Sequence, residues 1–413
     1  MNQDYAYLVC VDPHGNHNKF YEMKNENGQL VVTYGRVGIG SAQVHKYGLN
    51  EWNKKYNEKV KKGYEDRTNE HVGSKPLPKN GAQSNDYAEI PNEEIRKLVQ
   101  KLIDCSAQVI RENYTIGLDN VTDIMLENAQ KILDELYVIS NDKSPSLTKF
   151  NDNLIKLFSI LPRKMKNVND NTAKSVSDFT SILTREQNLY DTMQGAYKTQ
   201  QQQKVLAGKG EKTEKEKNMT ILEAFGLEIT PCEEKDIATI KKLLQGNAHQ
   251  FSRAWKVVNK KTEKAYKDCK KELGIKAAGV KLLWHGSTTE NWWSILNTGL
   301  KLKPNARITG KMFGNGIYFA PKAQKSIGYT SLSGSYWARG RNDIGYMGVY
   351  SVACGKAYDT DHTSYKFHDF GFKNLEHGCT YVYAHAGNQL RNDEIIVYRE
   401  DQLTIKYLVE LKK

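Results

Sequence analysis

Three residues that could bind a ligand follow directly after an apolar run. The run Leu-Leu-Trp at 282–284 is followed by His285, Gly286 and Ser287. A glycine leaves the backbone unhindered, so a planar ligand can approach main-chain N–H and C=O groups that are able to grip an amide. The imidazole and the hydroxyl on either side each add a hydrogen-bonding group. Because a single histidine after a strand is more often structural, the interpretation depends on further polar groups elsewhere.

Two tyrosines and a serine supply such groups further along the chain. In the stretch 310–329, three glycines precede a short apolar run that carries Tyr318, and Ser326 and Tyr329 follow it. Two aromatic rings beside a hydroxyl can sandwich a flat heteroaromatic ring and bind its substituent. Ordinary aromatic packing is the alternative, because the chain is rich in tyrosine.

A carboxylate stands at the start of a third apolar run. Glu394 precedes Ile-Ile-Val-Tyr, so it is either a solvated strand end or a placed catalytic group. A fixed carboxylate can stabilise positive charge that develops in a transition state, and it can polarise an attacking hydroxyl. The three runs predict three strands that must bring His285, Tyr318 and Glu394 together.

The region that carries these groups is predicted to be α+β. After about residue 220, short runs rich in β-branched and aromatic residues are mixed with a few helical patterns. Between about 92 and 205, strand signals are absent and apolar residues recur at helical spacing, which predicts an all-α bundle. Residues 1–65 are typical of strands joined by tight turns and followed by one lysine-rich helix. The polar stretches 66–91 and 198–219 are predicted to be connections.

Composition and charge narrow the class of protein. The 413 residues include 60 Lys and Arg against 48 Asp and Glu, a net charge of +12, which favours a polyanionic partner such as nucleic acid. The six cysteines form no CxxC pair, so we expect reduced thiols and no metal site. Neither a signal peptide nor an apolar run of about 18 residues is found, so we expect no membrane contact. The expected location is intracellular, in the nucleus of a eukaryote or in the cytoplasm and nucleoid of a bacterium.

Together, His285, Tyr318 and Glu394 resemble the His-Tyr-Glu signature of poly(ADP-ribose) polymerases. The surrounding segments LLWHGS, TGKMFGNGIYFAPKAQKS and DEIIVY are also similar to that family. Two N-terminal stretches, NKFY at 18–21 and TYGRVGIG at 33–40, resemble the small DNA-sensing domain named for its Trp-Gly-Arg motif. The helical bundle lies where the family carries its autoinhibitory helical domain. The chain is most similar to the compact, DNA-dependent members that lack zinc fingers.

The resemblance implies a multidomain α+β protein with a C-terminal ADP-ribosyltransferase fold. We expect a small β-sheet domain of the Trp-Gly-Arg type with one helix at 1–70, a linker at 71–91, an all-α regulatory domain at 92–222 and a catalytic domain at 223–413. NAD+ would be consumed as a substrate, with no true cofactor and no metal. Expected partners are DNA with strand breaks or nicks and acceptor proteins, including the chain itself, and we expect a monomer in solution.

The resemblance also implies roles for the residues that would bind NAD+. Main-chain groups of Gly286 and the Ser326 hydroxyl would hold the nicotinamide carboxamide. Tyr318 and Tyr329 would pack on the nicotinamide and its ribose, and His285 would bond to an NAD+ ribose hydroxyl. Further residues implied on the adenosine side are Ser287, Asn291 and Lys301.

Glu394 has the central chemical role in this assignment. It would bind the nicotinamide-ribose hydroxyl and orient the acceptor, in a groove that includes Met312 and Lys325. Cleaving the nicotinamide–ribose bond builds positive charge on the ribose, as in glycoside transfer through an oxocarbenium-like state. A fixed carboxylate near that charge therefore stabilises the transition state.

The resemblance places DNA contacts in the N-terminal domain. Tyr34 stands where the motif has tryptophan, and tyrosine can still stack on a sugar or base. Residues 1–92 include 12 Lys and Arg against 11 Asp and Glu, so any DNA surface there must be a local patch. The residues expected to contact DNA are Asn18, Lys19, Tyr34, Arg36, Lys54 and Lys55. A solvated helix face is the alternative interpretation of the lysines.

Two departures from the family pattern leave the product open. Asn392 and Asn315 stand where polymer-forming relatives often have a tyrosine and a lysine. The leading hypothesis is a DNA-break-stimulated ADP-ribosyltransferase that builds poly(ADP-ribose) on proteins in the DNA damage response. One alternative is a mono-ADP-ribosyltransferase that acts on protein or DNA ends. Another is a DNA-end-binding scaffold with a silent catalytic domain, which the intact His285, Tyr318 and Glu394 argue against.

Overall fold

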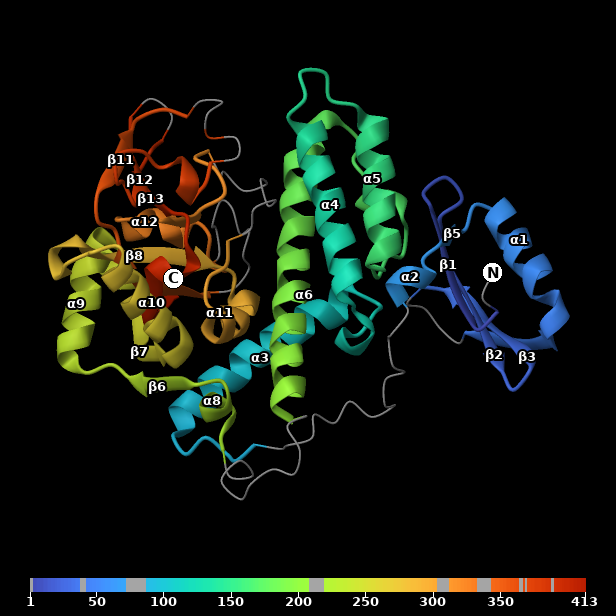
Figure 1. Cartoon of the computed structure of the whole chain (residues 1–413), viewed down its shortest axis with the longest axis horizontal. Coiled ribbons are helices and arrows are strands. Elements are labelled where there is room, and N and C mark those ends of the chain that lie inside the picture. Colours follow the sequence, from blue (N-terminus) through green and yellow to red (C-terminus); the bar gives the residue numbers. More distant parts are fainter. Residues whose placement is uncertain are drawn as a thin grey trace. The chain divides into compact units, whose positions relative to one another are not determined.

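Two compact units make up the chain in the computed structural model (Figure 1). The first contains Met1–Gly81 and Gln108–Tyr197, and the second contains Ala82–Ala107 and Lys198–Lys413. The structure describes residues 3–37, 42–71, 87–207, 219–302, 312–332, 343–363, 367, 370–387 and 390–413. Much of the predicted linker at 71–91, and residues 208–218 of the predicted connection, lie outside these ranges.

An antiparallel sheet with the strand order β4-β3-β2-β1-β5 forms the N-terminal part of the first unit. The strands are β1 (Tyr5–Asp12), β2 (His17–Glu26), β3 (Gln29–Arg36), β4 (Gln43–Gly48) and β5 (Glu65–Asp66). The helix α1 (Trp52–Lys61) contributes the buried Trp52 to a core with Leu8 and Met23, and α2 (Thr68–His71) follows β5. The predicted small sheet with a helix across it is confirmed.

Longer helices follow the sheet. They are α3 (Glu93–Asn113), α4 (Asp123–Ser140), α5 (Leu147–Ile160) and α6 (Phe179–Ala207). Thr122 and Ser146 immediately precede α4 and α5 and cap their N-termini, because each side chain accepts a hydrogen bond from a main-chain N–H of the first turn. Phe150 of α5 stacks on Phe179 of α6, with the ring centroids 3.8 Å apart. The predicted helical character is confirmed, but α6 also includes residues 198–207, where a polar connection is predicted, because glutamine and lysine are good helix formers.

Two sheets form the scaffold of the second unit, with the orders β6-β7-β14-β10-β8 and β11-β12-β13-β9. The strands are β6 (Leu227–Pro231), β7 (Phe251–Asn259), β8 (Val280–Ser287), β9 (Ile317–Phe319), β10 (Ile344–Ala353), β11 (Ala357–Thr360), β12 (Tyr381–Ala384), β13 (Glu394–Val397) and β14 (Leu403–Lys412). The helices are α8 (Ile221–Ala224), α9 (Glu234–Leu244), α10 (Lys260–Glu272), α11 (Trp292–Thr298) and α12 (Ala323–Ile327). A bridge between Trp284 and Ala320 joins β8 to the residue after β9, so the two sheets meet beside His285. The α+β prediction is confirmed.

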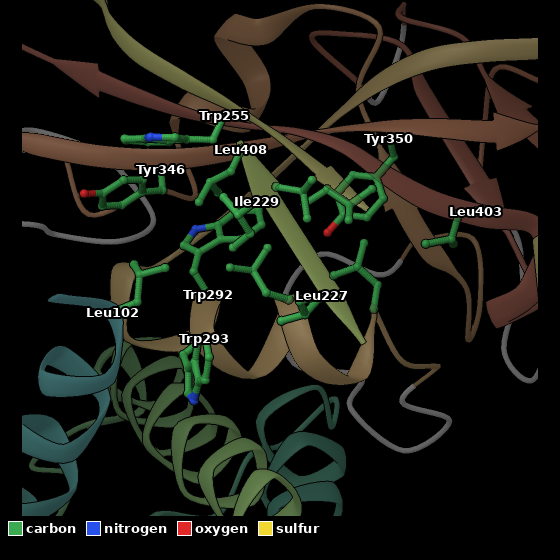
Figure 2. Packing of buried hydrophobic residues seen from close by; sticks show 14 of the residues in the cluster. Leu102, Leu227, Ile229, Trp255, Trp292, Trp293, Tyr346, Tyr350, Leu403 and Leu408 are labelled. Atoms are coloured by element: carbon green, nitrogen blue, oxygen red, sulfur yellow. The ribbon is translucent and has the colours of Figure 1, made fainter. Parts of the chain in front are cut away.

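The first part of α3 packs into the core of this second unit. Figure 2 shows Leu102 in the same apolar cluster as Trp292, and both side chains are completely buried. The Trp255 indole N–H donates a hydrogen bond to Glu94 Oε1 at 2.9 Å. The sequence predicts one helical domain over 92–222, whereas the structure groups the start of α3 with the sheets, because its apolar face completes their core.

Candidate active site

His285 lies near the end of β8 and is held by two neighbouring strands. Its Nδ1 lies 3.0 Å from the main-chain oxygen of Tyr318. Because a carbonyl oxygen only accepts, Nδ1 carries a proton, and in the neutral form of the ring Nε2 is the acceptor. Phe319 of β9 and Tyr350 of β10 pack edge-on against the imidazole, with centroids 5.8 and 6.1 Å away. The ring therefore has a set orientation and tautomer.

Tyr318 is fixed by the glycine-rich segment that precedes it. Its hydroxyl donates to the main-chain oxygen of Gly314 at 2.9 Å and accepts from the N–H of Phe313 at 3.0 Å. Because β9 pairs with β13, Tyr318 lies opposite Ile396, two residues after Glu394. The strands that carry the predicted tyrosine and glutamate are thus direct neighbours.

Gly286 lies against the backbone of Ser326 in α12. A Cβ atom at Gly286 would lie 2.0 Å from the Ser326 carbonyl oxygen, so only glycine fits there. Ser326 is buried, and its main-chain oxygen accepts a hydrogen bond from the N–H of Tyr329 at 3.1 Å. Burial raises the pKa of Tyr329, which keeps the phenol neutral. The three residues predicted to hold and stack on an amide-bearing ring are brought together.

Glu394 begins β13 in a buried position beside Lys325. Its Oε1 forms an ion pair with Lys325 Nζ. Its Oε2 is buried and has no hydrogen-bond partner among the described residues, although the residue is only 5% exposed. Burial lowers the pKa of Lys325 to about 8. A buried oxygen without a partner has a desolvation cost, which the hydroxyl of a ligand can relieve.

The other residues predicted to contact NAD+ or the acceptor include Asn291, Lys301 and Met312, and each makes its contacts in a different part of the second unit. Asn291 Nδ2 donates to Ser287 Oγ at 3.2 Å, just beyond the end of β8. Lys301 pairs with Glu400 at 2.7 Å on the wall of a cavity of about 30 Å³. Met312 packs against an apolar cluster of the four-stranded sheet. No described contact joins Lys301 to the residues at the ends of β8 and β13, so its role stays a prediction.

Sequence reasoning missed Tyr350 as a part of this site. Its ring packs behind His285, and burial raises the pKa of its hydroxyl, which has no partner among the described residues. Tyr350 therefore acts as an apolar wedge that orients the imidazole. The run that forms β10 is apolar except for Ser351. Only its pairing with β8, which sets Tyr350 opposite Leu283, distinguishes this tyrosine from ordinary core.

The described ranges contain neither a metal-binding cluster nor a membrane-spanning helix. No group of three or more His, Cys, Asp and Glu side chains is arranged there to hold a metal ion. Nor does any helix in those ranges combine the length and the apolar content needed to cross a membrane. All six cysteines are free thiols.

Two residues predicted to contact DNA are engaged inside the first unit. Asn18 is completely buried, and its Nδ2 donates to the main-chain oxygen of Arg163 at 3.2 Å. The Arg36 guanidinium donates to the main-chain oxygens of Asn16 at 2.7 Å and Lys166 at 2.9 Å. Both side chains therefore tie the sheet to the segment between α5 and α6; the burial of Asn18 leaves it no surface for DNA, whereas Arg36 is only half-buried and its contact with DNA stays a prediction.

The remaining predicted DNA contacts lie on β2, β3 and α1. Tyr34 is half-buried at the end of β3, and Lys19 lies in the neighbouring strand β2. Lys55 Nζ lies 4.3 Å from the centroid of the Tyr47 ring, whereas Lys54 is exposed. These side chains are accessible, and their contact with DNA stays a prediction.

Known proteins are similar to both parts of the chain. Residues 234–413 match the poly(ADP-ribose) polymerase catalytic domain, and residues 5–71 match the WGR domain. The chain is 35% identical over 140 residues to a poly(ADP-ribose) polymerase-like protein, 100L, of Invertebrate iridescent virus 6. This match covers 32% of this chain and 71% of the viral protein. The chain is 32% identical over 186 residues to the uncharacterised protein 101L of the same virus, with 45% and 74% covered. It is also 57% identical over 53 residues to poly(ADP-ribose) polymerase 2 of Homo sapiens, with 13% and 9% covered.

The matches contain the residues described above. His285, Tyr318 and Glu394 lie inside the matched catalytic domain, and the sheet with Tyr34 lies inside the matched WGR domain. The match to the viral protein 100L covers 71% of the length of that protein. The chain therefore belongs to the poly(ADP-ribose) polymerase family, and its C-terminal domain is an ADP-ribosyltransferase domain that takes NAD+ as its substrate.

Proposed function

We propose that the protein is a DNA-break-stimulated ADP-ribosyltransferase that builds poly(ADP-ribose) on proteins, including itself. The observation that carries the proposal is the buried carboxylate of Glu394. One of its oxygens is paired with Lys325, and the other has no partner among the described residues. A carboxylate kept out of water can act strongly on the charge and the hydroxyls of a bound ribose. A DNA-end-binding scaffold with a silent catalytic domain would not require a buried carboxylate at this position.

Before NAD+ is cleaved, the site would bind and orient its nicotinamide ring. Main-chain groups of Gly286 and the hydroxyl of Ser326 would bind the carboxamide, between the two tyrosine rings. His285 would accept a hydrogen bond from a ribose hydroxyl through Nε2, because its Nδ1–H is used by β9. As the bond to nicotinamide breaks, positive charge builds on the ribose, and Glu394 would stabilise that charge.

Transfer to the acceptor would use the same carboxylate. Glu394 Oε2 would accept a hydrogen bond from the incoming hydroxyl, while Lys325 holds Oε1 in place. Met312 and Lys325 would line the acceptor groove. In elongation the incoming hydroxyl belongs to an ADP-ribose unit that is already attached. Because Asn392 and Asn315 depart from the pattern of polymer-forming relatives, the length of the product is the quantity to measure.

Two measurements test the activity. Gel mobility after incubation with NAD+ should show a smear, because polymers of many lengths form. A single step instead supports the mono-ADP-ribosyltransferase alternative. Nicotinamide release should rise when nicked or broken DNA is added. No release at all would support the scaffold alternative, and equal release with and without DNA contradicts DNA stimulation.

We propose that DNA stimulation acts through the polar contacts inside the first unit. Asn18 and Arg36 bind main-chain oxygens of the segment between α5 and α6, and Arg67 donates to Ser159 Oγ of α5 at 2.7 Å. A DNA phosphate that draws Arg36 away would weaken this attachment and loosen the helices. In the closed state the helices would block NAD+, and in the open state they would admit it. DNA would favour the open state over the closed one, with a typical coupling free energy of about 1–3 kcal/mol.

Amide exchange on the full chain tests this autoinhibition. Exchange in α4, α5 and α6 should quicken when broken DNA is added, because the helices open more often. The full chain is needed because a shortened chain that starts at residue 223 also lacks Leu102 and the other core side chains of α3. Exchange in these helices that does not respond to broken DNA contradicts the proposal.

A further inference from the structure

Three aromatic rings lie in a row across β3 and β4, and we call them the aromatic strip (Tyr34, His45 and Tyr47). The ring centroids of Tyr34 and His45 are 5.6 Å apart with 19° between the ring planes, and those of His45 and Tyr47 are 6.2 Å apart with 20°. Tyr34 pairs with Gln43 across the sheet. Because side chains alternate along a strand, positions 43, 45 and 47 share the face of Tyr34.

Lysines of α1 lie on the aromatic strip. Lys55 Nζ is 4.3 Å from the ring centroid of Tyr47, and Lys59 Nζ is 5.5 Å from that of Tyr34. Burial lowers the pKa of Lys59, and the neighbouring charge of Lys62 lowers it further. The ammonium groups are therefore crowded together beside the rings, and a polyanion would relieve their repulsion.

The aromatic strip is reachable from solvent. The strand β4 is at the edge of the sheet, and His45 is exposed. Tyr34 and Tyr47 pack against the core on one side but are only half-buried. The hydroxyl of Tyr34 lies 3.3 Å from His45 Nε2, which holds the first two rings in nearly parallel planes. A row of accessible, ordered rings flanked by ammonium groups is typical of a surface on which bases stack.

We propose that the aromatic strip binds an unpaired stretch of nucleic acid, so that the protein prefers DNA breaks with a single-stranded end. This inference rests on the proposed DNA stimulation and specifies the kind of break. The ring centroids are 5.6 and 6.2 Å apart, wider than the rise of about 3.4 Å per base in a duplex. Bases on successive rings must therefore be unstacked from one another, as in an extended single strand.

Binding of nucleic acid would replace contacts between lysines and rings inside the free protein by contacts with bases and phosphates. Lys55 and Lys59 now rest on the rings of the aromatic strip. Incoming bases would take the ring faces, because base–aromatic stacking tolerates any base. The displaced ammonium groups would then pair with the phosphates that follow each base. The same lysines thus cover the rings in the free protein and neutralise the backbone in the complex.

Fluorescence anisotropy of the full chain with three labelled probes tests the proposal. The probes are a blunt duplex, the same duplex with a tail of about five unpaired thymidines, and the same duplex with an abasic tail of that length. The thymidine tail should bind more tightly than the blunt duplex. The abasic tail should gain much less, because it adds phosphates but no bases.

Ring variants identify the surface that is responsible. Loss of one stacking ring typically weakens binding about 5- to 150-fold, so the double variant His45→Ala, Tyr47→Ala should lose the gain from the thymidine tail. Tyr47→Phe keeps the ring and should keep the gain, which separates lost stacking from lost folding. Lys55→Ala should reduce tail binding more than Lys46→Ala, which removes the same charge from the opposite face of β4.

Two results would overturn the proposal: an equal gain with the abasic tail, or a thymidine gain that survives in the double variant. NAD+ turnover separates this failure from failure of the proposed function. If broken DNA stimulates turnover but the tail adds nothing, only the single-strand preference is wrong. If the ring-dependent gain is present but no DNA stimulates turnover, only the stimulation is wrong. If no probe binds, both proposals are wrong.

Discussion

Replacing Gly286 by alanine tests the grip on the nicotinamide most directly. The added Cβ would lie 2.0 Å from the carbonyl oxygen, 2.9 Å from the carbonyl carbon and 3.3 Å from the Cα of Ser326. Ordinary van der Waals contact begins at 3.4 Å, so the oxygen must move by about 1.4 Å. The obstacle is backbone, which cannot rotate away as a side chain can. The two groups that would hold the carboxamide must therefore separate.

The expected loss follows from this displacement. Misplacing a binding group by about 1 Å can cost roughly 10²-fold in rate, so kcat/KM for nicotinamide release should fall about 100-fold in Gly286→Ala. Overpacking of this kind typically also lowers the free energy of unfolding by about 1–3 kcal/mol. The assay is nicotinamide release at several NAD+ concentrations, together with thermal unfolding of the same preparation.

The matched control is Gly246→Ala in the same unit. A Cβ at Gly246 would meet nothing within 4 Å, and no left-handed backbone angle is present there. This variant should keep both its turnover and its stability. If Gly286→Ala is folded and turns over NAD+ as fast as Gly246→Ala, close approach between β8 and α12 is not needed for substrate binding, and the assigned role of Gly286 is wrong.

Further substitutions test the other parts of the site. Glu394→Gln keeps the shape of the side chain but removes its charge, so nicotinamide release should fall about 10²–10³-fold with little change in NAD+ affinity; polymer of unchanged length on a gel would remove Glu394 from its role. The pKa of Lys325 is lowered to about 8, so its charge is lost as the pH rises through that value, and kcat should fall there. Lys325→Met should be slow already at neutral pH and should lack that alkaline fall; the same pH profile in both proteins would refute the positioning role. Leu102→Ala should lower the free energy of unfolding by about 2–5 kcal/mol, and unchanged thermal unfolding would show that α3 is not part of the core. Arg36→Ala should weaken the DNA-stimulated rate and reduce the salt dependence of DNA binding by about one phosphate contact, whereas an unchanged salt slope would mean that Arg36 serves only its contacts inside the chain.

Much of the fold was predictable because its signals are local. The apolar run before His285 and the run after Glu394 became β8 and β13, since each run is long enough to bury one strand. The periodic apolar positions of α4 and α5 face a core as predicted. The end of α6 was less predictable, because the residues of 198–207 are mostly good helix formers but are too polar to show the apolar periodicity of a helix.

The sequence by itself determined which chemical groups the site contains. His285 and Glu394 were recognisable because each stands at the edge of an apolar run, with Gly286 next to the histidine, whereas the role of Ser326 follows only from the resemblance of its segment to the family. Those patterns depend only on residues that are neighbours along the chain. They also determined the order of the segments, from the small sheet through the helices to the α+β region.

Only the tertiary structure decided how those groups are used. The ion pair of Lys325 with Glu394 and the closeness of Gly286 to Ser326 join residues from different elements. The motif predicts Asn18 as a DNA contact, whereas in the fold its side chain is buried and donates to the main-chain oxygen of Arg163. Such pairings depend on strand register and on packing between elements, which are settled by the whole core and leave no signal in the residues on either side.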